Sequence, residues 1–353
     1  MTTPNLEIAA LPIADKAREI IEVLRTRQVL VLAGETGSGK TTQIPKLCLQ
    51  AGLGEHGRVA VTQPRRVAAI SLARRVAEEM GTLDGDFVAH KVRFDDRTGK
   101  GTRVVFATDG TLLAELQSDP LLRRYSCIVV DEAHERSLNI DFLIGVLRQI
   151  LSKRSDLRIV VSSATIDTER FSKAFQDAKG PAPVIVVEGR TFPVDILYRD
   201  EMVGEEGERE DSLPRRVSSA CAEMLALAGD GDLLCFLPGE REIRETQREL
   251  EKVREHSLRG IEVVPLFGRL SAADQDRVFH PGTKRRVILT TNVAETSVTV
   301  PRIRMVVDTG LARLSRYASR TRTKRLQIEP VSQASAKQRA GRCGRLGPGI
   351  CLR

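Results

Sequence analysis

The run of residues 34–41, GETGSGKT, has the residue types and spacing of a loop that binds the phosphates of a nucleotide. Its glycines let backbone N–H groups turn toward phosphate oxygens, and a helix that starts there adds partial positive charge. Lys40 is long enough to reach the β- and γ-phosphates, and the Thr41 hydroxyl is a ligand for Mg²⁺. We expect the rest of the phosphate-binding loop to consist of Gly34, Glu35, Thr36, Gly37, Ser38, Gly39 and Thr42. The segment therefore predicts a site for a nucleoside triphosphate with Mg²⁺.

The residues on either side of this loop have the pattern that such a site needs. The apolar run 28–33, QVLVLA, predicts a buried strand, and residues 42–50, TQIPKLCLQ, predict a helix with Pro45 in its first turn. A glycine turn that only resembles the motif is the alternative. Because a strand precedes the loop and a helix follows it, the nucleotide site is the better interpretation.

A pair of carboxylates follows a second apolar run. Asp131 and Glu132 come directly after residues 127–130, CIVV, which predict another buried strand. An aspartate at a strand end, across from a phosphate loop, is placed to hold Mg²⁺ directly or through water. Glu132 is a candidate for the base that orients or deprotonates the attacking water, and a second candidate metal ligand. Together the two motifs predict an enzyme that hydrolyses a nucleoside triphosphate.

The composition is that of a folded globular chain with a polyanionic partner. Of 353 residues, 41% are hydrophobic and 29% charged, and the formal net charge of +8 favours nucleic acid weakly. Aromatic residues make up only 4%, so we expect contact with backbone phosphates rather than stacking on bases. Such binding tolerates many sequences.

Targeting signals and cysteine usage point to a reducing compartment. No apolar run approaches the ~20 residues that cross a bilayer. The first twenty residues lack the layout of a signal peptide. The six cysteines are scattered, which predicts small buried side chains rather than disulfides or zinc ligands. We therefore expect a cytoplasmic protein.

Strand-like and helical runs alternate along the whole chain, which predicts an α/β fold with two mostly parallel sheets, each covered by helices on both faces. The expected elements of the first half are strands 29–33, 58–62, 103–108, 127–130 and 159–163 with helices 67–80 and 141–151. Those of the second half are strands 233–236, 261–266, 286–290 and 305–308 with helices 215–227, 240–255 and 271–279. The acidic stretch 199–211 predicts a solvated loop.

The acidic pair belongs to a longer segment, DEAHERS at residues 131–137, which resembles the signature of the DEAH-box ATP-dependent RNA helicases of superfamily 2. Other stretches are similar to further motifs of that family and come in the same order. They are TQPRRVAA at 62–69, TDGTLL at 108–113, SAT at 163–165, FLPGERE at 236–242, TNVAETS at 291–297 and QRAGRCGR at 338–345. Residues 306–320 and 325–330 most resemble the bacterial HrpA-type branch.

The resemblance implies two tandem RecA-like domains, an ATP-binding domain at residues 1–188 and a helicase C-terminal domain at 189–353. It also implies ATP, or several nucleoside triphosphates, with Mg²⁺ as cofactor. The expected partner is single-stranded RNA or an RNA duplex with an overhang, with DNA left open. We further expect a monomer, and further C-terminal domains in a longer protein, because relatives continue past the last motif.

The resemblance assigns catalytic roles to residues of the second domain. Arg342 and Arg345 match arginine fingers, whose permanent charge and planar donors suit phosphate oxygens. Gln338 matches a residue that positions water with Glu132. Without the motif, the arginines would be read as solvated surface charges.

The remaining implied contacts fall into three groups. Arg75 and Phe279 match the residues that sandwich adenine, and Asp308 matches a ribose contact. The positions that match the lining of the strand channel are Arg65, Arg66, Arg93, Thr108, Gly268, Thr291 and Asn292. The triplet that matches the link between the ATP site and the strand consists of Ser163, Ala164 and Thr165.

Two other functions stay open on the sequence alone. One is an RNA-stimulated ATPase that clamps or remodels RNA without processive unwinding. The other is a nucleotide hydrolase that acts on a protein or serves a transporter, which the motifs resembling strand contacts disfavour.

Overall fold

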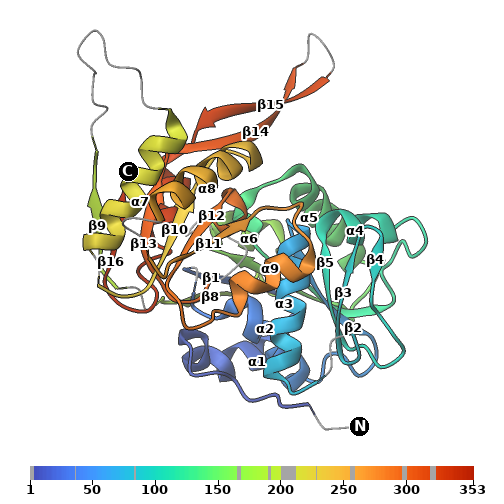
Figure 1. The fold of residues 1–353 in the computed structure, drawn as a ribbon. Helices are drawn as coiled ribbons and strands as arrows, with labels where there is room; N and C mark the ends of the chain where they lie inside the picture. The colour runs from blue at the N-terminus through green and yellow to red at the C-terminus, as the bar shows by residue number, and fades with distance from the viewer. Residues whose placement is uncertain are drawn as a thin grey trace. The chain divides into compact units, whose positions relative to one another are not determined.

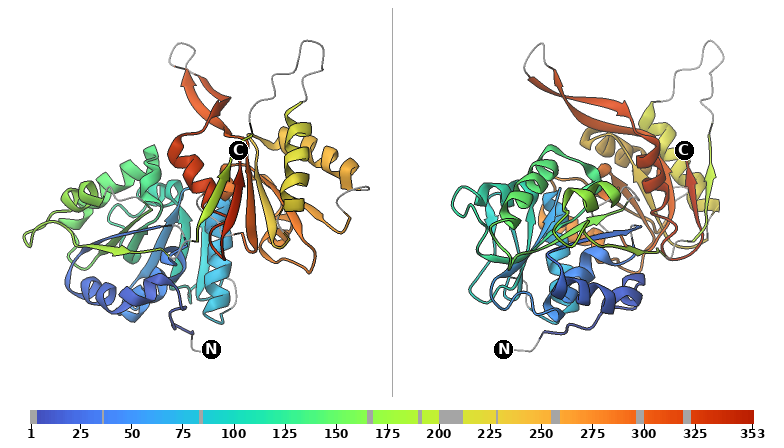
Figure 2. Two further views of the ribbon diagram at one scale, coloured as in Figure 1. Left: turned by 90° about the vertical axis from the view of Figure 1, so that its left-hand side faces the viewer. Right: turned by 180° about the vertical axis from the view of Figure 1, so that it is seen from behind.

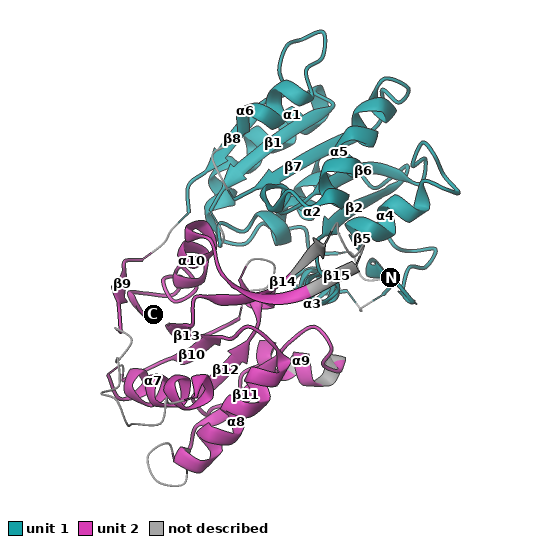
Figure 3. Ribbon diagram, turned by 90° about the horizontal axis from the view of Figure 1, so that it is seen from above, with its two compact units in different colours: residues 1–190 teal, residues 191–353 magenta. Residues whose placement is uncertain are grey.

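The computed structural model describes residues 4–353 except 36, 83–84, 165–167, 190–191, 200–211, 228, 255–258, 296–299 and 319–322. The chain divides into two compact units, residues 1–190 and 191–353 (Figures 1 and 3). Among the described residues, no helix is both long enough and apolar enough to cross a membrane. The acidic stretch expected as a loop falls almost wholly outside the described residues.

Unit 1 is built on an eight-stranded sheet with the strand order β4-β3-β5-β2-β6-β7-β1-β8. Its strands are β1 (Val29–Gly34), β2 (Arg58–Gln63), β3 (Val88–Val92), β4 (Asp95–Asp96), β5 (Val104–Thr108), β6 (Tyr125–Val130), β7 (Arg158–Ser163) and β8 (Val184–Val187). Every neighbouring pair is parallel except the short hairpin of β3 and β4. The carboxyl ends of seven strands therefore meet at one edge.

Alternate residues of these strands enter two different cores, which explains why the strands are apolar throughout. Leu30 and Leu32 of β1 lie in the core formed with α1 (Ala17–Thr26), α2 (Lys40–Gln50) and α3 (Arg66–Glu79). Val29 and Val31 lie in the core formed with α4 (Asp109–Glu115), α5 (Leu138–Leu151) and α6 (Thr168–Ala174). The sheet of unit 1 is thus covered by helices on both faces (Figure 2).

Unit 2 repeats this plan on a parallel six-stranded sheet with the order β11-β12-β10-β13-β16-β9. Its strands are β9 (Val194–Leu197), β10 (Asp232–Phe236), β11 (Glu262–Leu266), β12 (Arg286–Thr290), β13 (Ile303–Asp308) and β16 (Gly349–Leu352). Its helices are α7 (Leu213–Leu227), α8 (Glu240–Arg254), α9 (Ala272–Phe279) and α10 (Gln333–Ala340). A separate antiparallel hairpin joins β14 (Leu311–Ala318) to β15 (Thr323–Pro330).

The expected α/β class is confirmed, and the predicted elements lie within a few residues of their observed bounds. One boundary was wrong: α2 begins at Lys40, so Pro45 lies in its second turn. The start is fixed by Gly39, whose φ of 89° ends the loop immediately before the helix. All six cysteines are free and buried, as expected.

Arginines at the amino ends of strands bind backbone carbonyls of neighbouring loops and helices. In unit 1, Arg58 donates to the Gly99 carbonyl at 2.8 Å, Arg103 to that of Gly54 at 3.0 Å and Arg158 to that of Leu24 at 3.0 Å. In unit 2, Arg286 donates to the carbonyls of Arg277 and Val278 at 3.0 Å. Since carbonyl oxygens carry partial negative charge, these guanidinium groups hold two loops of unit 1, the end of α1 and the end of α9 against the sheets.

Arg286 also forms a deeply buried ion pair in unit 2. Its Nε lies 2.9 Å from Oδ2 of Asp232, and the two side chains are 1% and 0% exposed. Arg302 lies 3.8 Å from the other oxygen of the same carboxylate. A carboxylate buried this completely depends on its cations.

We predict that Arg286→Met destabilises unit 2 by about 3–5 kcal/mol, because Asp232 keeps its charge and loses its nearest partner. Hydrogen exchange of the β10 and β12 amides measures this, since it reports opening of that sheet directly. The matched control is Arg241→Met, which removes an exposed guanidinium from α8 that pairs with Glu245 at 2.8 Å. Equal exchange in both variants would contradict the prediction.

Candidate nucleotide-binding site

The strand order of unit 1 arranges the predicted site residues along its carboxyl edge. From β3 to β1, the residues that end the strands or follow them are Arg93, Thr108, Gln63, Asp131, Ser163 and Gly34. The residues predicted to bind a strand of nucleic acid therefore lie toward β3, and the phosphate loop lies at β1. In α/β sheets this edge is where ligands bind.

At two positions of the phosphate loop, Gly34 and Gly39, the structure leaves no room for a side chain. A Cβ on Gly34 would lie 2.5 Å from the Val187 carbonyl oxygen, and one on Gly39 would lie 2.8 Å from Leu11 Cδ1. Gly39 is also left-handed. No described side chain caps the first turn of α2, so its amides are available to an anion. Thr36, also predicted to line this loop, lies outside the described residues.

Lys40 lies at the centre of the loop with its ammonium against the loop's own oxygens. Its Nζ donates to the Glu35 carbonyl at 2.9 Å and to Ser38 Oγ at 3.1 Å, and also to the Gly34 carbonyl. Thr42, the last predicted loop residue, is half-buried and bonds the Gly39 carbonyl at 3.5 Å. An ammonium held among oxygens in this way fits a site for phosphate oxygens.

Asp131 joins the phosphate loop to β2. Its carboxylate is 2% exposed, and Oδ2 accepts from Thr41 Oγ1 at 2.6 Å and from Gln63 Nε2 at 2.7 Å. Both hydrogen bonds that the described residues make to Asp131 converge on Oδ2, which leaves Oδ1 for other ligands. A hydroxyl beside a carboxylate at a phosphate loop is a donor set that fits Mg²⁺. Gln63 was missed at the sequence level, although it lies within a quoted motif.

The turn after Asp131 is strained. Glu132 has φ 52° and Arg136 φ 47°, both left-handed and neither a glycine. Such residues cost on the order of 1–3 kcal/mol each and gather at functional sites. This backbone conformation places the Glu132 side chain, which is 11% exposed, beside His134.

His134 ties this turn to the end of β7. Its Nδ1 accepts from the Ala164 N–H at 3.2 Å, so that nitrogen carries no proton. Burial lowers the pKa of His134, an effect that the Lys40 charge reinforces and the negative charges of Glu135 and Asp131 oppose. Glu132 Oε2 lies 3.5 Å from the same nitrogen. Ser163 is buried beside this junction, and Thr165 lies outside the described residues.

The strand-binding candidates of unit 1 are exposed or half-buried. Arg65 lies 3.6 Å from Glu135, and Arg66 and Arg93 are exposed. Thr108 caps α4 and accepts from the Thr111 N–H at 3.3 Å. Burial raises the pKa of the adjacent Asp109 to about 6, opposed by the Thr62 hydroxyl and reinforced by Glu135 and Asp131.

A hairpin tip beside these residues was not predicted. Phe94 is 92% exposed with φ 67°, and the Arg93 guanidinium lies 4.8 Å from its ring centre. Asp95 and Asp96 hold the hairpin through His90 at 3.0 Å and Lys91 at 3.3 Å. This edge therefore presents one aromatic ring, which the low aromatic content did not suggest.

In unit 2, buried contacts join the segment QRAGRCGR at 338–345 to Glu295 of the segment TNVAETS at 291–297. Arg339 has no exposed side-chain surface, and it binds Glu295 Oε2 at 3.0 Å and Asp308 Oδ1 at 2.9 Å beneath Phe236. Arg342 is 4% exposed and donates to the Glu295 carbonyl. Neither Arg339 nor Glu295 was singled out from the sequence, although a fully buried arginine depends on such carboxylates.

The other predicted residues of unit 2 lie at the carboxyl ends of its strands or on its helices. Gly268 follows β11, and Thr291 and Asn292 follow β12 at the start of a short 3-10 turn. Gln338 on α10 and Arg345 just beyond it are half-buried. Gly268, Thr291 and Asn292 therefore share the carboxyl edge of a parallel sheet, as the unit 1 motifs do.

The two residues predicted to sandwich adenine belong to different units. Arg75 is exposed on α3 and pairs with Glu79 at 2.9 Å. Phe279 ends α9 and is half-buried.

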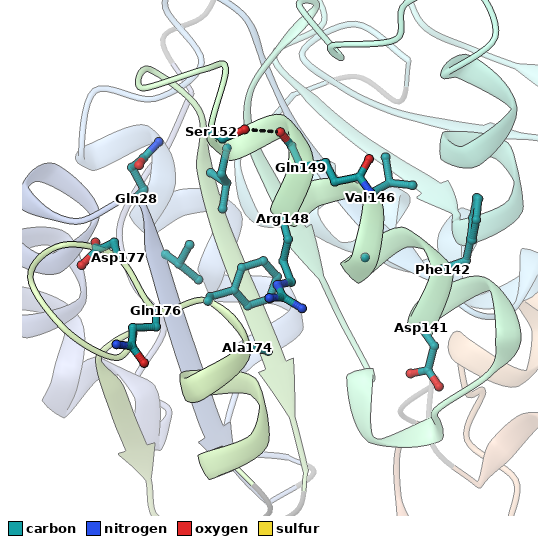
Figure 4. Close-up of a pocket in the computed structure, with 14 residues that line it drawn as sticks. Gln28, Asp141, Phe142, Val146, Arg148, Gln149, Ser152, Ala174, Gln176 and Asp177 are labelled. Atoms are coloured by element: carbon teal, nitrogen blue, oxygen red, sulfur yellow. Dashed lines mark hydrogen bonds between the residues drawn. The ribbon is translucent and has the colours of Figure 1, made fainter.

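A separate hollow of about 740 Å³ lies at the opposite end of β1 (Figure 4). It is lined by Gln28 and Val29 at the start of β1, by Phe142 and Arg148 of α5 and by the segment after Ala174. Val29 and Gly34 are the first and last residues of β1, so roughly 17 Å of strand separates this hollow from the phosphate loop. It is not the nucleotide site.

Comparison with known proteins agrees with this geometry. Residues 14–173 match the family model described as DEAD/DEAH box helicase, and residues 217–347 match that of the helicase conserved C-terminal domain. The chain therefore belongs to the DEAD/DEAH box helicases, and its two units are tandem RecA-like domains.

Within this family the chain is similar to HrpA proteins. It is 50% identical over 345 residues to an ATP-dependent RNA helicase HrpA homolog of Haemophilus influenzae, covering 98% of this chain and 26% of that protein. It is 51% identical to the HrpA of Escherichia coli, with 97% and 26% covered. The crystal structure of the E. coli DEAH/RHA helicase HrpB matches with a TM-score of 0.86 and 37% identity, over 97% of this chain and 42% of that one. The chain thus spans about a quarter of the length of these HrpA relatives.

We predict that Lys40→Met weakens binding of a fluorescent ATP analogue with Mg²⁺ by about tenfold or more, because a charge-assisted contact to phosphate is lost. The matched control is Lys46→Met on the same helix. Lys46 is buried against Glu79 at 3.0 Å, away from the loop, so its loss should lower the melting temperature and leave nucleotide affinity intact. Equal affinity loss in both variants would contradict the role of Lys40.

Proposed function

We propose that this chain is the motor core of an ATP-dependent RNA helicase, which couples ATP hydrolysis to movement on RNA or to its remodelling. The observation that carries the proposal is the cluster of Lys40, Thr41 and Asp131 at the same sheet edge as the strand-binding motifs. ATP is the expected nucleotide, as the family implies, and other triphosphates are open.

Unit 1 supplies the nucleotide chemistry. The amides of the loop and Lys40 bind the phosphates, and Thr41 and Asp131 hold Mg²⁺, with Glu132 as a further ligand candidate. The ion supplies positive charge that offsets the charge on the phosphates. Glu132 acts as the base toward the attacking water, since its strained turn aims a carboxylate beside the same edge.

Unit 2 supplies the groups that complete the site. Arg342 and Arg345 stabilise the transition state as arginine fingers, and Gln338 helps Glu132 to position water. The family ranges 14–173 and 217–347 support domains at 1–188 and 189–353. Loss of the γ-phosphate then removes the attraction between the domains, which shifts their equilibrium.

Base and sugar contacts are the least constrained part of the proposal. Arg75 and Phe279 sandwich adenine by stacking, without base-specific hydrogen bonds. Asp308 is engaged by Arg339 through Oδ1, its Oδ2 lies 3.8 Å from Arg353, and its side chain has no exposed surface, so its ribose contact rests on the family resemblance alone.

RNA is held by its backbone. Arginine and hydroxyl groups at the carboxyl edges of both sheets suit phosphate and sugar, which carry no sequence information. The candidates are Arg65, Arg66, Arg93, Thr108, Gly268, Thr291 and Asn292, and Ser163, Ala164 and Thr165 link them to the nucleotide. The preference for RNA is a family expectation, and DNA is the comparison in the test below.

A second candidate is an RNA-stimulated ATPase that clamps RNA without processive unwinding. The phosphate loop and the strand-binding candidates on the same sheet edge would serve this function as well. Full-length activity, a monomeric state and the cytoplasmic location are likewise proposals.

We predict that single-stranded RNA stimulates ATP hydrolysis by this chain, and more than DNA of the same sequence does. RNA affinity should fall about tenfold or more as salt rises from low to moderate concentration, because phosphate contacts release counterions.

Glu132→Gln should retain ATP and lower turnover by about 10²–10⁴-fold, since an amide cannot accept the proton. A rate of ATP hydrolysis that neither RNA nor DNA changes would overturn the proposal. A duplex-unwinding assay distinguishes unwinding from clamping.

We predict that Arg345→Ala lowers the hydrolysis rate about 10³-fold while ATP affinity changes far less, since a finger acts on the transition state. Single-turnover hydrolysis and nucleotide titration measure the two quantities separately. Lys337→Ala, which removes an exposed cation of α10, should leave both unchanged. A parallel loss of affinity and rate in Arg345→Ala would assign that residue to nucleotide binding instead.

A further inference from the structure

Strand β2 lies between β5 and β6 in the sheet of unit 1. β5 ends at Thr108, a strand-binding candidate, and β6 is followed by Asp131 of the metal site. Gln63 is the last residue of β2 and pairs with Thr108 in the parallel ladder. It therefore lies where the two halves of the edge meet.

The Gln63 side chain has no exposed surface, and its amide is committed to Asp131. A carboxylate oxygen only accepts, so Nε2 must face Oδ2, at 2.7 Å. No described group donates to the other amide oxygen, Oε1. The bond to Asp131 is thus what fixes the orientation of this buried amide, and a buried hydrogen bond to a charged group is strong.

The backbone connects Gln63 rigidly to the strand-binding arginines. Pro64 follows it with a ring that locks φ, and Arg65 comes next as the N-cap of α3. Arg65 also lies 3.6 Å from Glu135, in the segment that begins with Asp131. A shift of Arg65 toward a phosphate is therefore felt both at the end of β2 and in the turn after β6.

We propose that Gln63 is a positioning residue that couples RNA binding at Arg65 and Arg66 to the metal-binding carboxylate of Asp131. This inference rests on the proposed function. Oδ2 receives donors from Thr41 and Gln63 alone among the described residues. If the Thr41 hydroxyl turns to a metal ion, Gln63 is the donor that keeps Asp131 in place.

This route differs from the contact between His134 and Ala164. That contact joins the turn after β6 to the end of β7, on the side of the sheet order away from Thr108. The Gln63 route runs toward β5 and the strand-binding arginines. The Gln63 route and the contact between His134 and Ala164 therefore predict different effects of substitution on RNA affinity.

The test measures binding linkage rather than turnover. RNA affinity is determined by fluorescence anisotropy of a labelled single-stranded RNA, with and without a non-hydrolysable ATP analogue and Mg²⁺. The ratio of the two affinities is the coupling factor, and linkage requires the nucleotide affinity to change by the same factor when RNA is added. Gln63→Met keeps the side-chain volume and removes the donor. We expect it to reduce the coupling factor about fivefold or more, toward the value of one that means no coupling.

Gln28→Met is the matched control. Gln28 Nε2 donates to the Arg154 carbonyl at 2.9 Å at the opposite edge of the same sheet. It undergoes the same substitution and loses one hydrogen bond, so general loosening of the sheet would appear there too. We expect its coupling factor to equal that of the unaltered chain.

Gln63→Asn keeps the amide but is one methylene too short for the 2.7 Å bond, so it should also lose coupling, which keeps the test valid if Gln63→Met fails to fold. An unchanged coupling factor in either folded variant would overturn the inference while the proposed function stands. An unaltered chain that binds RNA and nucleotide without influence on each other would overturn both.

Discussion

One buried carboxylate oxygen, Oδ2 of Asp131, joins the phosphate loop to the neighbouring strand through two short hydrogen bonds. Because a buried charge must be compensated, the positions of Thr41 and Gln63 are constrained by it. Thr41 lies in the first turn of α2 and Gln63 ends β2, so three elements are held in register at one point. The arrangement of the nucleotide site in unit 1 depends on this oxygen.

Burial and backbone strain are concentrated in the same few residues. Glu132 and Arg136 occupy left-handed conformations on either side of a short turn, and burial lowers the pKa of His134 within it. A strained turn persists only where its surroundings over-determine it. Here the restraint includes the Ala164 N–H, which reaches across from β7. In unit 2 the buried charge is that of Arg339, which has no exposed side-chain surface and pairs with both Glu295 and Asp308.

The fold class, the central strands and most helices were predictable from the sequence, because Leu30 and Val31 both lie in apolar cores and produce a continuous apolar run. The edge strands β8 and β9 were not predicted, since one face of β8 and most of β9 are exposed and leave a mixed pattern. The phosphate loop and the Asp131–Glu132 pair were found from residue types and spacing, whereas the full DEAH segment and the segment at 338–345 were found by resemblance to a family. The roles of Gln63 and Arg339 depend on contacts between residues 68 and 31 positions apart, which no local pattern reveals.

The arginines at the amino ends of the strands change how the charge of the chain is to be understood. Arg58 donates to a loop carbonyl and Arg158 to a carbonyl of α1, so both guanidinium groups hold neighbouring segments at the amino edge of the sheet. Lysine offers the same charge without the fork, and substitution by it would loosen the loop while the isoelectric point stayed nearly fixed. Some of the arginines that contribute to the net charge of +8 thus serve the fold. The net charge therefore overstates how strongly the chain attracts a polyanion.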